Sequence, residues 1–257
     1  MTDELRTHDG LTLRYRSWSR NPDDALPPVV LLHGFAADSR LNWEGPGLVE
    51  ALVARGRRVY ALDARGHGDS DRPHDDALYG ESLMARDVRL LIDRTGADQV
   101  HLVGYSMGAV VAVLAAAQDA RVRRLVAGGI GAGAVEVGGL DTRVMPPELV
   151  SAALTADDAA GAPARTRAFR VLADSAGGDR LALAAQIRAV HRDALPLDRI
   201  VVPTLVLTGG SDPLATRPEV LASAIAGAEL TVLPGDHLTV VRDPGFAEAV
   251  VAFLSRA

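Results

Sequence analysis

Residues 100–117, VHLVGYSMGAVVAVLAAA, decide the expected fold of the chain. The short apolar run Val100–Val103 predicts a strand buried on both faces, and the apolar stretch that ends at Ala117 predicts a buried helix. Between them lies Gly104-Tyr105-Ser106-Met107-Gly108, which fits the pattern G-x-S-x-G at a strand-to-helix turn. Such a turn would lift the Ser106 hydroxyl off the sheet and aim the first N–H groups of the helix at the same point.

The alternation of strand and helix extends in both directions from this motif. We expect strands at 11–18, 29–32, 59–62, 125–127, 204–207 and 230–233, and helices at 48–54, 82–95, 218–226 and 245–254. A turn is expected at 21–24, where the sequence reads NPDD. Repeated alternation predicts an α/β fold: a mostly parallel, doubly wound sheet covered by helices on both faces.

The alternation stops between residues 131 and 195. This stretch is rich in Ala, Gly, Arg and Asp, and helical windows occur at 147–154, 164–174 and 181–190 without a buried strand pattern. We interpret residues 131–195 as a small helical cap inserted into a core formed by 1–130 and 196–257. An insertion of this kind is expected at the carboxyl ends of the strands, where α/β folds bind their ligands.

The composition excludes several classes of function. The chain has 257 residues, 48% of them hydrophobic, which is enough for one sizeable core. Its formal charge of −6 argues against binding to nucleic acid or to an anionic membrane. All 27 basic residues are Arg, which excludes Schiff-base and P-loop lysines, and the absence of Cys excludes disulfides, thiol catalysis and thiolate metal sites.

Two further observations bear on location. The charged start of the chain has no apolar segment typical of a secretory signal, and the longest apolar run, 109–117, is too short to cross a bilayer. We therefore expect a cytoplasmic protein.

Five motifs together resemble the α/β-hydrolase family, in its serine hydrolase branch of esterases and haloperoxidase-like proteins. The resemblance covers nearly the whole chain except the cap. The motifs are Leu32-His33-Gly34-Phe35, the run from Asp63 to Ser70 (DARGHGDS), Gly104 to Gly108, Gly209-Gly210-Ser211-Asp212 and Gly235-Asp236-His237. They are specific for the superfamily but not for a substrate.

The resemblance implies a catalytic triad in the chain order Ser, acid, His. Ser106 would be the nucleophile, His237 the general base that takes its proton, and Asp212 the acid that fixes the His237 tautomer. Asp212 could instead only begin the turn before Pro213. Two other carboxylates compete for the role of the acid. Asp236 is adjacent to His237 and should point elsewhere, and Asp243 is better explained as an N-cap of the last helix.

The resemblance also implies an oxyanion hole made by backbone N–H groups. The positions that match are Met107, directly after the nucleophile, and Phe35, in the loop after the strand at 29–32. His33-Gly34-Phe35 contains one glycine, which is typical of the general hydrolase loop and not of the multi-glycine esterase loop. The other family-turn histidines, His33 and His67, are expected to hold loops together by hydrogen bonds.

Other patterns have weaker functional interpretations. Gly129–Ala134 formally fits the dinucleotide fingerprint G-x-G-x-x-A, but glycines and prolines interrupt the helix it requires, so a hinge into the cap is the better interpretation. No metal-binding pair of histidines is present, and we expect no cofactor and no metal. Arginines of the cap could bind a substrate carboxylate or phosphate, although a solvated helix face is the commoner role; they are Arg143, Arg165, Arg167, Arg170, Arg180 and Arg188.

These observations favour a serine hydrolase that cleaves a small or medium acyl substrate, most simply a carboxylic ester, through an acyl-enzyme on Ser106. A small-molecule substrate is the only partner that the sequence indicates, and it does not indicate an oligomeric state. Two alternatives remain open. The same pocket could serve a sensor of small ligands, or the chain could be a carbon–carbon bond hydrolase or perhydrolase of the same fold.

Overall fold

The buried apolar runs form the centre of one sheet in the computed structural model, which describes residues 2–21, 26–158 and 160–256. Within these ranges the sheet has eight strands in the order β1-β2-β4-β3-β5-β6-β7-β8. The strands from β3 to β8 run parallel, while β1 and β2 are antiparallel to their neighbours. The fold is therefore the predicted α/β type, with one antiparallel edge.

The strands agree with the predicted ones, and their ends differ by a few residues. Their bounds are β1 Thr2–Arg6, β2 Thr12–Trp18, β3 Val29–Leu32, β4 Val59–Asp63, β5 Val100–Tyr105, β6 Val122–Gly128, β7 Thr204–Gly209 and β8 Glu229–Leu233. Strand β1 was not predicted, because only Leu5 in this charged edge strand is buried. Most of the turn expected at 21–24 lies outside the described residues.

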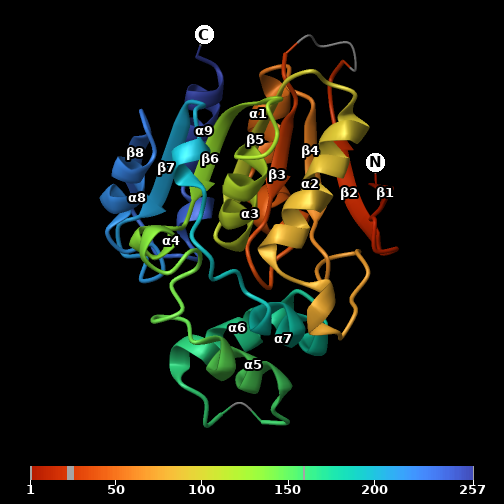
Figure 1. Cartoon of the computed structure of the whole chain (residues 1–257), viewed down its shortest axis with the longest axis vertical. Helices are drawn as coiled ribbons and strands as arrows, with labels where there is room; N and C mark the ends of the chain where they lie inside the picture. Colours follow the sequence, from red (N-terminus) through yellow and green to blue (C-terminus); the bar gives the residue numbers. More distant parts are fainter. Residues whose placement is uncertain (1, 22–25, 159, 257) are drawn as a thin grey trace.

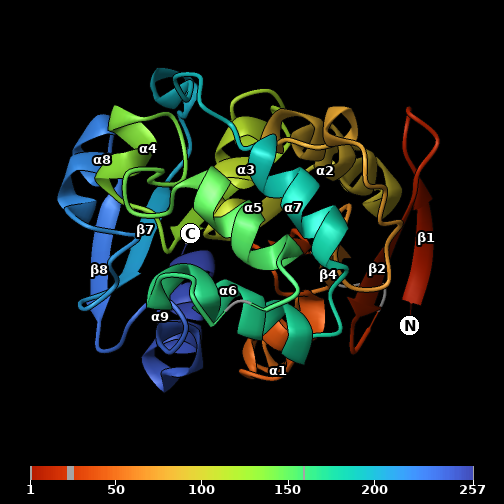
Figure 2. The ribbon, with the colours of Figure 1, turned by 90° about the horizontal axis from the view of Figure 1, so that it is seen from below.

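Two helical layers cover the sheet, as Figure 2 shows from the end of the strands. Helices α1 (Leu48–Ala54) and α9 (Pro244–Leu254) pack on one face around Trp43 and Phe246. The opposite face is covered by α2 (Glu81–Thr95), α3 (Met107–Ala116) and α8 (Pro218–Ala224). Every residue of α3 up to Ala115 is buried, so the helix that follows Ser106 is packed on all sides.

Four helices fall within the described part of the predicted cap. Helices α5 (Pro147–Thr155), α6 (Ala164–Ser175) and α7 (Arg180–Arg188) lie beyond the carboxyl ends of the parallel strands (Figure 1). The fourth helix, α4 (Ala132–Glu136), was not predicted, and it packs against α8 beside the sheet. The exact division of the chain into core and cap stays a prediction.

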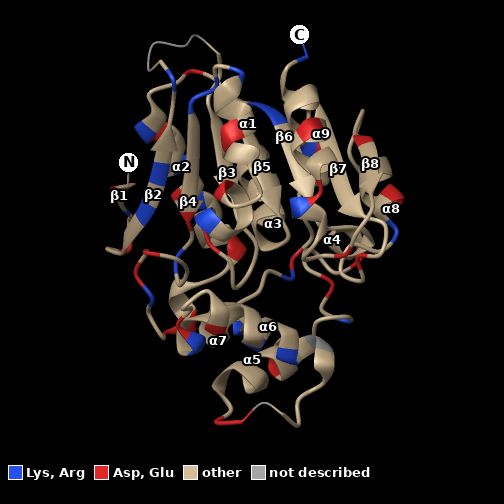
Figure 3. Cartoon of the chain, turned by 180° about the vertical axis from the view of Figure 1, so that it is seen from behind, with Lys and Arg blue, Asp and Glu red and all other residues tan. Residues whose placement is uncertain are grey.

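The remaining helical turns are short and lie in the loops around the sheet. A π-helix spans Arg40–Glu44, and 3₁₀ turns occur at Asp76–Leu78, Leu197–Arg199 and Val240–Arg242. Arginines and carboxylates are interspersed over both the sheet layers and the cap (Figure 3). Within the described ranges, no helix combines the length and the apolar character that a membrane crossing requires.

Candidate active site

Ser106 occupies a strained position between β5 and α3. Its backbone lies at φ 54° and ψ −118°, a region that residues with a side chain rarely adopt. The flanking glycines make the turn possible, because a β carbon on Gly104 would lie 2.1 Å from the Gly108 carbonyl oxygen. A β carbon on Gly108 would lie 2.1 Å from the Leu32 carbonyl oxygen. The two glycines therefore let α3 start directly against β5 and β3.

The structure brings the three predicted triad residues together. The Nε2 atom of His237 lies 3.0 Å from Oγ of Ser106, and its Nδ1 atom lies 2.8 Å from Oδ2 of Asp212. In the tautomer that the carboxylate favours, Nδ1–H donates to Asp212 and Nε2 accepts the Ser106 hydroxyl. All three residues are buried, so this chain of hydrogen bonds is largely shielded from solvent.

Asp212 is held in place from its other side by backbone groups. Its Oδ1 atom accepts hydrogen bonds from the N–H groups of Leu214 and Ala215, at 2.8 and 3.2 Å. The two competing carboxylates point elsewhere, as predicted. Asp236 accepts the N–H groups of the next turn, including that of Thr239, and Asp243 caps α9 through Gly245.

A tyrosine that the sequence analysis did not select holds the loop of His237. The Tyr105 hydroxyl donates to the His237 carbonyl oxygen at 2.8 Å, and the two ring centroids are 5.2 Å apart. Burial, together with the nearby Asp212 and Asp236, raises the pKa of Tyr105 well above its usual value, so the hydroxyl stays a donor. The sequence signal for Tyr105 was its position directly before Ser106 in the G-x-S-x-G pattern, at the end of β5.

The two predicted oxyanion donors belong to segments that adjoin Ser106. Met107 begins α3, and Phe35 follows Gly34 in the loop after β3. Gly34 is close to Ser106, because a β carbon built on it would lie 3.4 Å from Cβ of Ser106. Among the described residues, no hydrogen-bond acceptor takes the N–H of Phe35 or Met107. Both groups are therefore free to donate to a ligand.

Two cavities flank His237 beneath the cap. The larger has a volume of about 220 Å³ and is bounded by the loop after β3, including Phe35, and by Tyr105. The smaller measures about 140 Å³ and extends toward Pro213 and Leu214. Phe169 and Leu172 of α6 line both cavities, as do His237 and Leu238. The Phe169 ring lies 5.9 Å from that of Phe35, so the cap meets the core directly above the site.

Several cap arginines are engaged with the protein itself. Arg143 pairs with Asp141 and Glu136, and Arg188 pairs with Asp76. Arg170 donates to three backbone carbonyl groups around the end of α5. In the described part of the chain the lining of the two cavities contains a single arginine, Arg242, which comes from the core. The hypothesis that cap arginines bind substrate therefore has no support from the lining.

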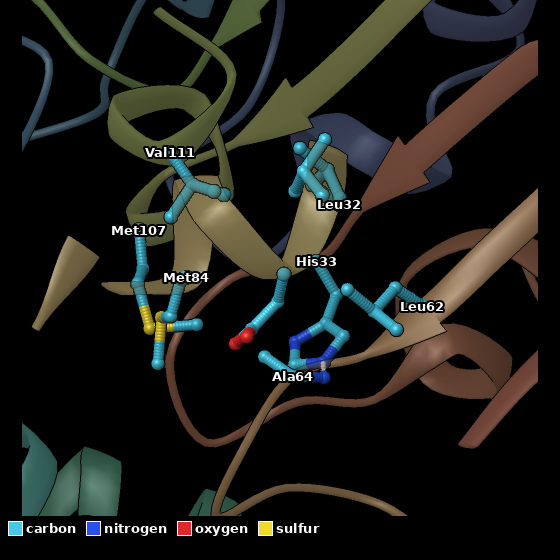
Figure 4. A pocket seen from close by; sticks show the side chains of 10 residues that line it. Leu32, His33, Leu62, Ala64, Met84, Met107 and Val111 are labelled. Atoms are coloured by element: carbon cyan, nitrogen blue, oxygen red, sulfur yellow. Dashed lines mark hydrogen bonds between the residues drawn. The ribbon is translucent and has the colours of Figure 1, made fainter. Parts of the chain in front are cut away.

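The histidines near the site hold loops, as predicted. His33 Nε2 accepts the Ala64 N–H at 3.0 Å (Figure 4). The Nδ1–H of His33 donates to the Gly34 carbonyl. His67 bonds to the Arg65 carbonyl through Nδ1 at 3.0 Å, and burial lowers the pKa of His67 to about 3. The void of about 10 Å³ behind the turn is too small for a substrate. The side of the Gly104–Gly108 turn that faces this void is thus well packed.

The glycine-rich segment at 129–134 is occupied by the protein's own backbone. A β carbon on Gly131 would lie 2.4 Å from the Thr216 carbonyl oxygen, which also accepts the Ala132 N–H at 2.9 Å. The helix that follows, α4, has only five residues. This arrangement supports the hinge interpretation. Nowhere in the described ranges do three or more His, Asp or Glu side chains form a group that could hold a metal ion.

Comparison with known proteins identifies the family. The model of the alpha/beta hydrolase fold family matches residues 27–158, so the chain belongs to that family. Over nearly their full lengths, the chain resembles two solved structures. It is 29% identical to a hydrolase from Pseudomonas aeruginosa PA01, with a TM-score of 0.80 and coverage of 99% of this chain and 98% of that one. It is 26% identical to the enol-lactonase from Burkholderia xenovorans LB400, with a TM-score of 0.73 and coverage of 99% and 100%.

Curated relatives match over a shorter segment. The mouse (Mus musculus) sn-1-specific diacylglycerol lipase ABHD11 is 43% identical over 99 residues, which are 37% of this chain and 30% of that protein. Epoxide hydrolase B of Mycobacterium tuberculosis is 40% identical over 91 residues, 35% of this chain and 25% of that protein. The chain thus matches under a third of the length of these relatives. They are hydrolases with different named activities, so the comparison supports hydrolase chemistry of this fold and leaves the reaction open.

Proposed function

We propose that this protein is a serine hydrolase that cleaves a small or medium acyl substrate, with a carboxylic ester as the simplest substrate class. The observation that carries the proposal is the continuous hydrogen-bond chain from Ser106 through His237 to Asp212, at 3.0 and 2.8 Å. An isolated serine hydroxyl is a poor nucleophile at neutral pH, and this arrangement supplies the base that it needs.

The proposed reaction has two stages. In the first, Ser106 Oγ attacks the carbonyl carbon while His237 Nε2 takes its proton, and His237 then returns that proton to the leaving alkoxide. In the second, His237 takes a proton from water, the resulting hydroxide attacks the acyl-enzyme, and Ser106 recovers its proton as the carboxylic acid leaves. Asp212 stabilises the imidazolium in both stages and fixes its orientation.

Charge on the tetrahedral intermediate would be stabilised by the free N–H groups of Phe35 and Met107. Met107 is also the first residue of α3, so the partial positive charge of the helix N-terminus acts at the same point. The Ser106 side chain is an alcohol, which favours acyl transfer over the alkyl-enzyme chemistry expected of a carboxylate nucleophile at that turn. This residue therefore favours acyl hydrolysis over epoxide opening.

The experiment compares the wild-type protein with Ser106→Ala on a series of p-nitrophenyl esters and with a fluorophosphonate probe. We expect the wild type to release p-nitrophenol and to be labelled at Ser106 alone, and the variant to do neither. Labelling at another residue would contradict the proposal. An absence of turnover and labelling, together with thermal stabilisation by small ligands, would instead support the sensor function.

A further inference from the structure

Tyr105 links two parts of the site that are far apart in the sequence. It is the last residue of β5 and directly precedes Ser106. Its hydroxyl donates at 2.8 Å to the carbonyl oxygen of His237, which lies 132 positions further along the chain. A single side chain thus connects the strand that carries the proposed nucleophile to the loop that carries the proposed base.

The ring of Tyr105 is held on several sides. The residue is only 3% exposed, and the Phe246 ring meets it edge-on with the centroids 6.0 Å apart. Its other neighbours are the backbones of Gly128 and Gly129, at and just after the end of β6. A β carbon on Gly128 would lie 2.8 Å from Cδ2 of the ring, and one on Gly129 would lie 2.6 Å from Cζ. This close packing leaves the ring little room to move, so its hydroxyl is a fixed point for the loop of His237.

The main chain of His237 depends on this hydroxyl. The neighbouring residues of its turn bond to one another, since Asp236 accepts the N–H groups of Leu238 and Thr239. Among the residues that the structure describes, no hydrogen bond other than that of Tyr105 reaches the N–H or the carbonyl of His237. Removing the hydroxyl would therefore leave the carbonyl of this buried residue unpaired, and the imidazole would lose the anchor of its own main chain.

We propose that Tyr105 is a positioning residue: through its hydroxyl it holds the His237 imidazole where the ring can both receive and return a proton. This inference rests on the proposed serine hydrolase function. In the acylation step the Ser106 proton moves to Nε2 and then to the leaving-group oxygen, as the bond from Oγ to the acyl carbon forms and the ester C–O bond breaks. The second transfer requires Nε2 to point at an atom of the substrate, and a displacement of about 1 Å can slow such a step about 100-fold.

The test measures how well His237 returns the proton to the leaving group. It compares kcat/KM, which reports acylation, for two esters of similar shape, p-nitrophenyl butyrate and p-cresyl butyrate. p-Nitrophenolate is stable as an anion at neutral pH, whereas p-cresolate is as basic as the phenolate of a tyrosine side chain and leaves more readily with a proton from His237. The ratio of the two kcat/KM values is independent of the fraction of protein that folds, so it responds to the position of His237 and not to a loss of stability.

Tyr105→Phe keeps the packing of the ring and removes only the hydroxyl. We expect its kcat/KM for p-cresyl butyrate to fall about tenfold to hundredfold, and the ratio of the nitrophenyl to the cresyl ester to rise about fivefold. Tyr79→Phe is the matched control, because Tyr79 is 4% exposed and its hydroxyl also donates to a backbone carbonyl, that of Pro73 at 2.6 Å. Tyr79 lines neither cavity, so the ratio of its variant should equal that of the wild type.

A wild-type ratio in Tyr105→Phe would overturn the inference, whether or not both rates fall, and would leave the hydrolase function in place. A shift of the same size in Tyr79→Phe would overturn it too, because the effect would then not depend on contact with His237. A wild-type protein that hydrolyses neither ester and reacts with no fluorophosphonate would instead contradict the proposed function, and the role of Tyr105 would fall with it. The wild-type measurement therefore separates the two failures.

Discussion

His237 and Asp212 meet through one carboxylate oxygen, while the other oxygen of Asp212 is bound by two backbone N–H groups. The loop after β7 thus fixes the orientation in which the carboxylate contacts the imidazole. The unexposed Asp212 side chain makes this contact in a shielded environment, where a hydrogen bond to an ionised group is strong.

This relationship predicts the effect of Asp212→Asn. The amide can keep the two backbone hydrogen bonds at Oδ1, so we expect a thermal midpoint close to that of the wild type. Its NH₂ group faces Nδ1 and favours the wrong imidazole tautomer, so the acylation rate should fall by about 10⁴-fold. Burst kinetics with p-nitrophenyl acetate measures that rate. The control is Asp243→Asn, because Asp243 only caps α9. A nearly normal rate in Asp212→Asn would assign the acid to another carboxylate.

The position of Phe169 between the two cavities predicts that the cap limits the size of the substrate. Because its ring lines both cavities, Phe169→Ala should join the volumes of about 220 and 140 Å³ into one space. The ratio of kcat/KM for p-nitrophenyl octanoate to that for the butyrate should then rise by at least about tenfold, because even one methylene group in an apolar pocket changes kcat/KM by about 10-fold or more. Val171→Ala is the matched control, since Val171 lies on the same helix and is 61% exposed. An unchanged chain-length preference in Phe169→Ala would refute this role.

The burial of Glu81 predicts that the folded protein becomes less stable as the pH rises. Burial raises the pKa of Glu81 to about 7 from 4.5, and its carboxylate accepts the His191 N–H at the end of the cap. A carboxyl group whose pKa is higher in the folded state binds its proton more tightly when folded. Its contribution to stability is therefore complete below pH 4.5 and is lost as the pH rises to about 7.

The variant Glu81→Gln tests this linkage, because glutamine has the same shape and does not titrate. Between pH 4.5 and about pH 7, the unfolding free energy of the wild type should fall by about 3 kcal/mol more than that of the variant. Urea unfolding near pH 5 and near pH 8 measures most of the difference. Glu50→Gln, at an exposed position of α1, should retain the wild-type pH dependence. A parallel pH dependence in Glu81→Gln and the wild type would show that Glu81 does not titrate in this way.

The close packing around Gly108 predicts a loss of stability when a single methyl group is added at this position. Its missing β carbon would lie 2.1 Å from the Leu32 carbonyl oxygen, and rigid backbone is on both sides of the contact. Gly108→Ala should lower the unfolding free energy by about 3 kcal/mol or more, as measured by denaturant titration. Gly161→Ala should be nearly neutral, because no heavy atom would lie within 4 Å of its β carbon. Similar stabilities of the two variants would contradict this packing.

The sequence predicted the parts of the fold that depend on local pattern. Strands such as Val29–Leu32 are continuous apolar runs, and the Gly104–Gly108 turn has a sequence signature of its own. Strand β1 lacked such a pattern because it is an exposed edge that depends on pairing with β2. The short helix α4 forms from Ala and Gly against α8, so tertiary packing decides it.

The same distinction applies to the site. Ser106, Asp212 and His237 follow strands of one sheet, so their convergence could be predicted from the order of the strands. The contact between Phe35 and Phe169 could not, because it depends on how the cap settles on the core. The hydrogen bond from the Gly34 N–H to Asn42 Oδ1, which holds the loop after β3, could not be predicted either, since a π-helix has no hydrophobic period to detect.

The placement of helices α5 to α7 has a consequence for engineering. The proposed nucleophile, base, acid and amide donors all come from outside residues 131–195, whereas Phe169 and Leu172 come from within them. Replacing this segment with that of a homologue would therefore change the helices that cover the two cavities and leave the residues of the core beneath them unchanged. The substrate selectivity of the protein could then be changed by exchanging one continuous segment.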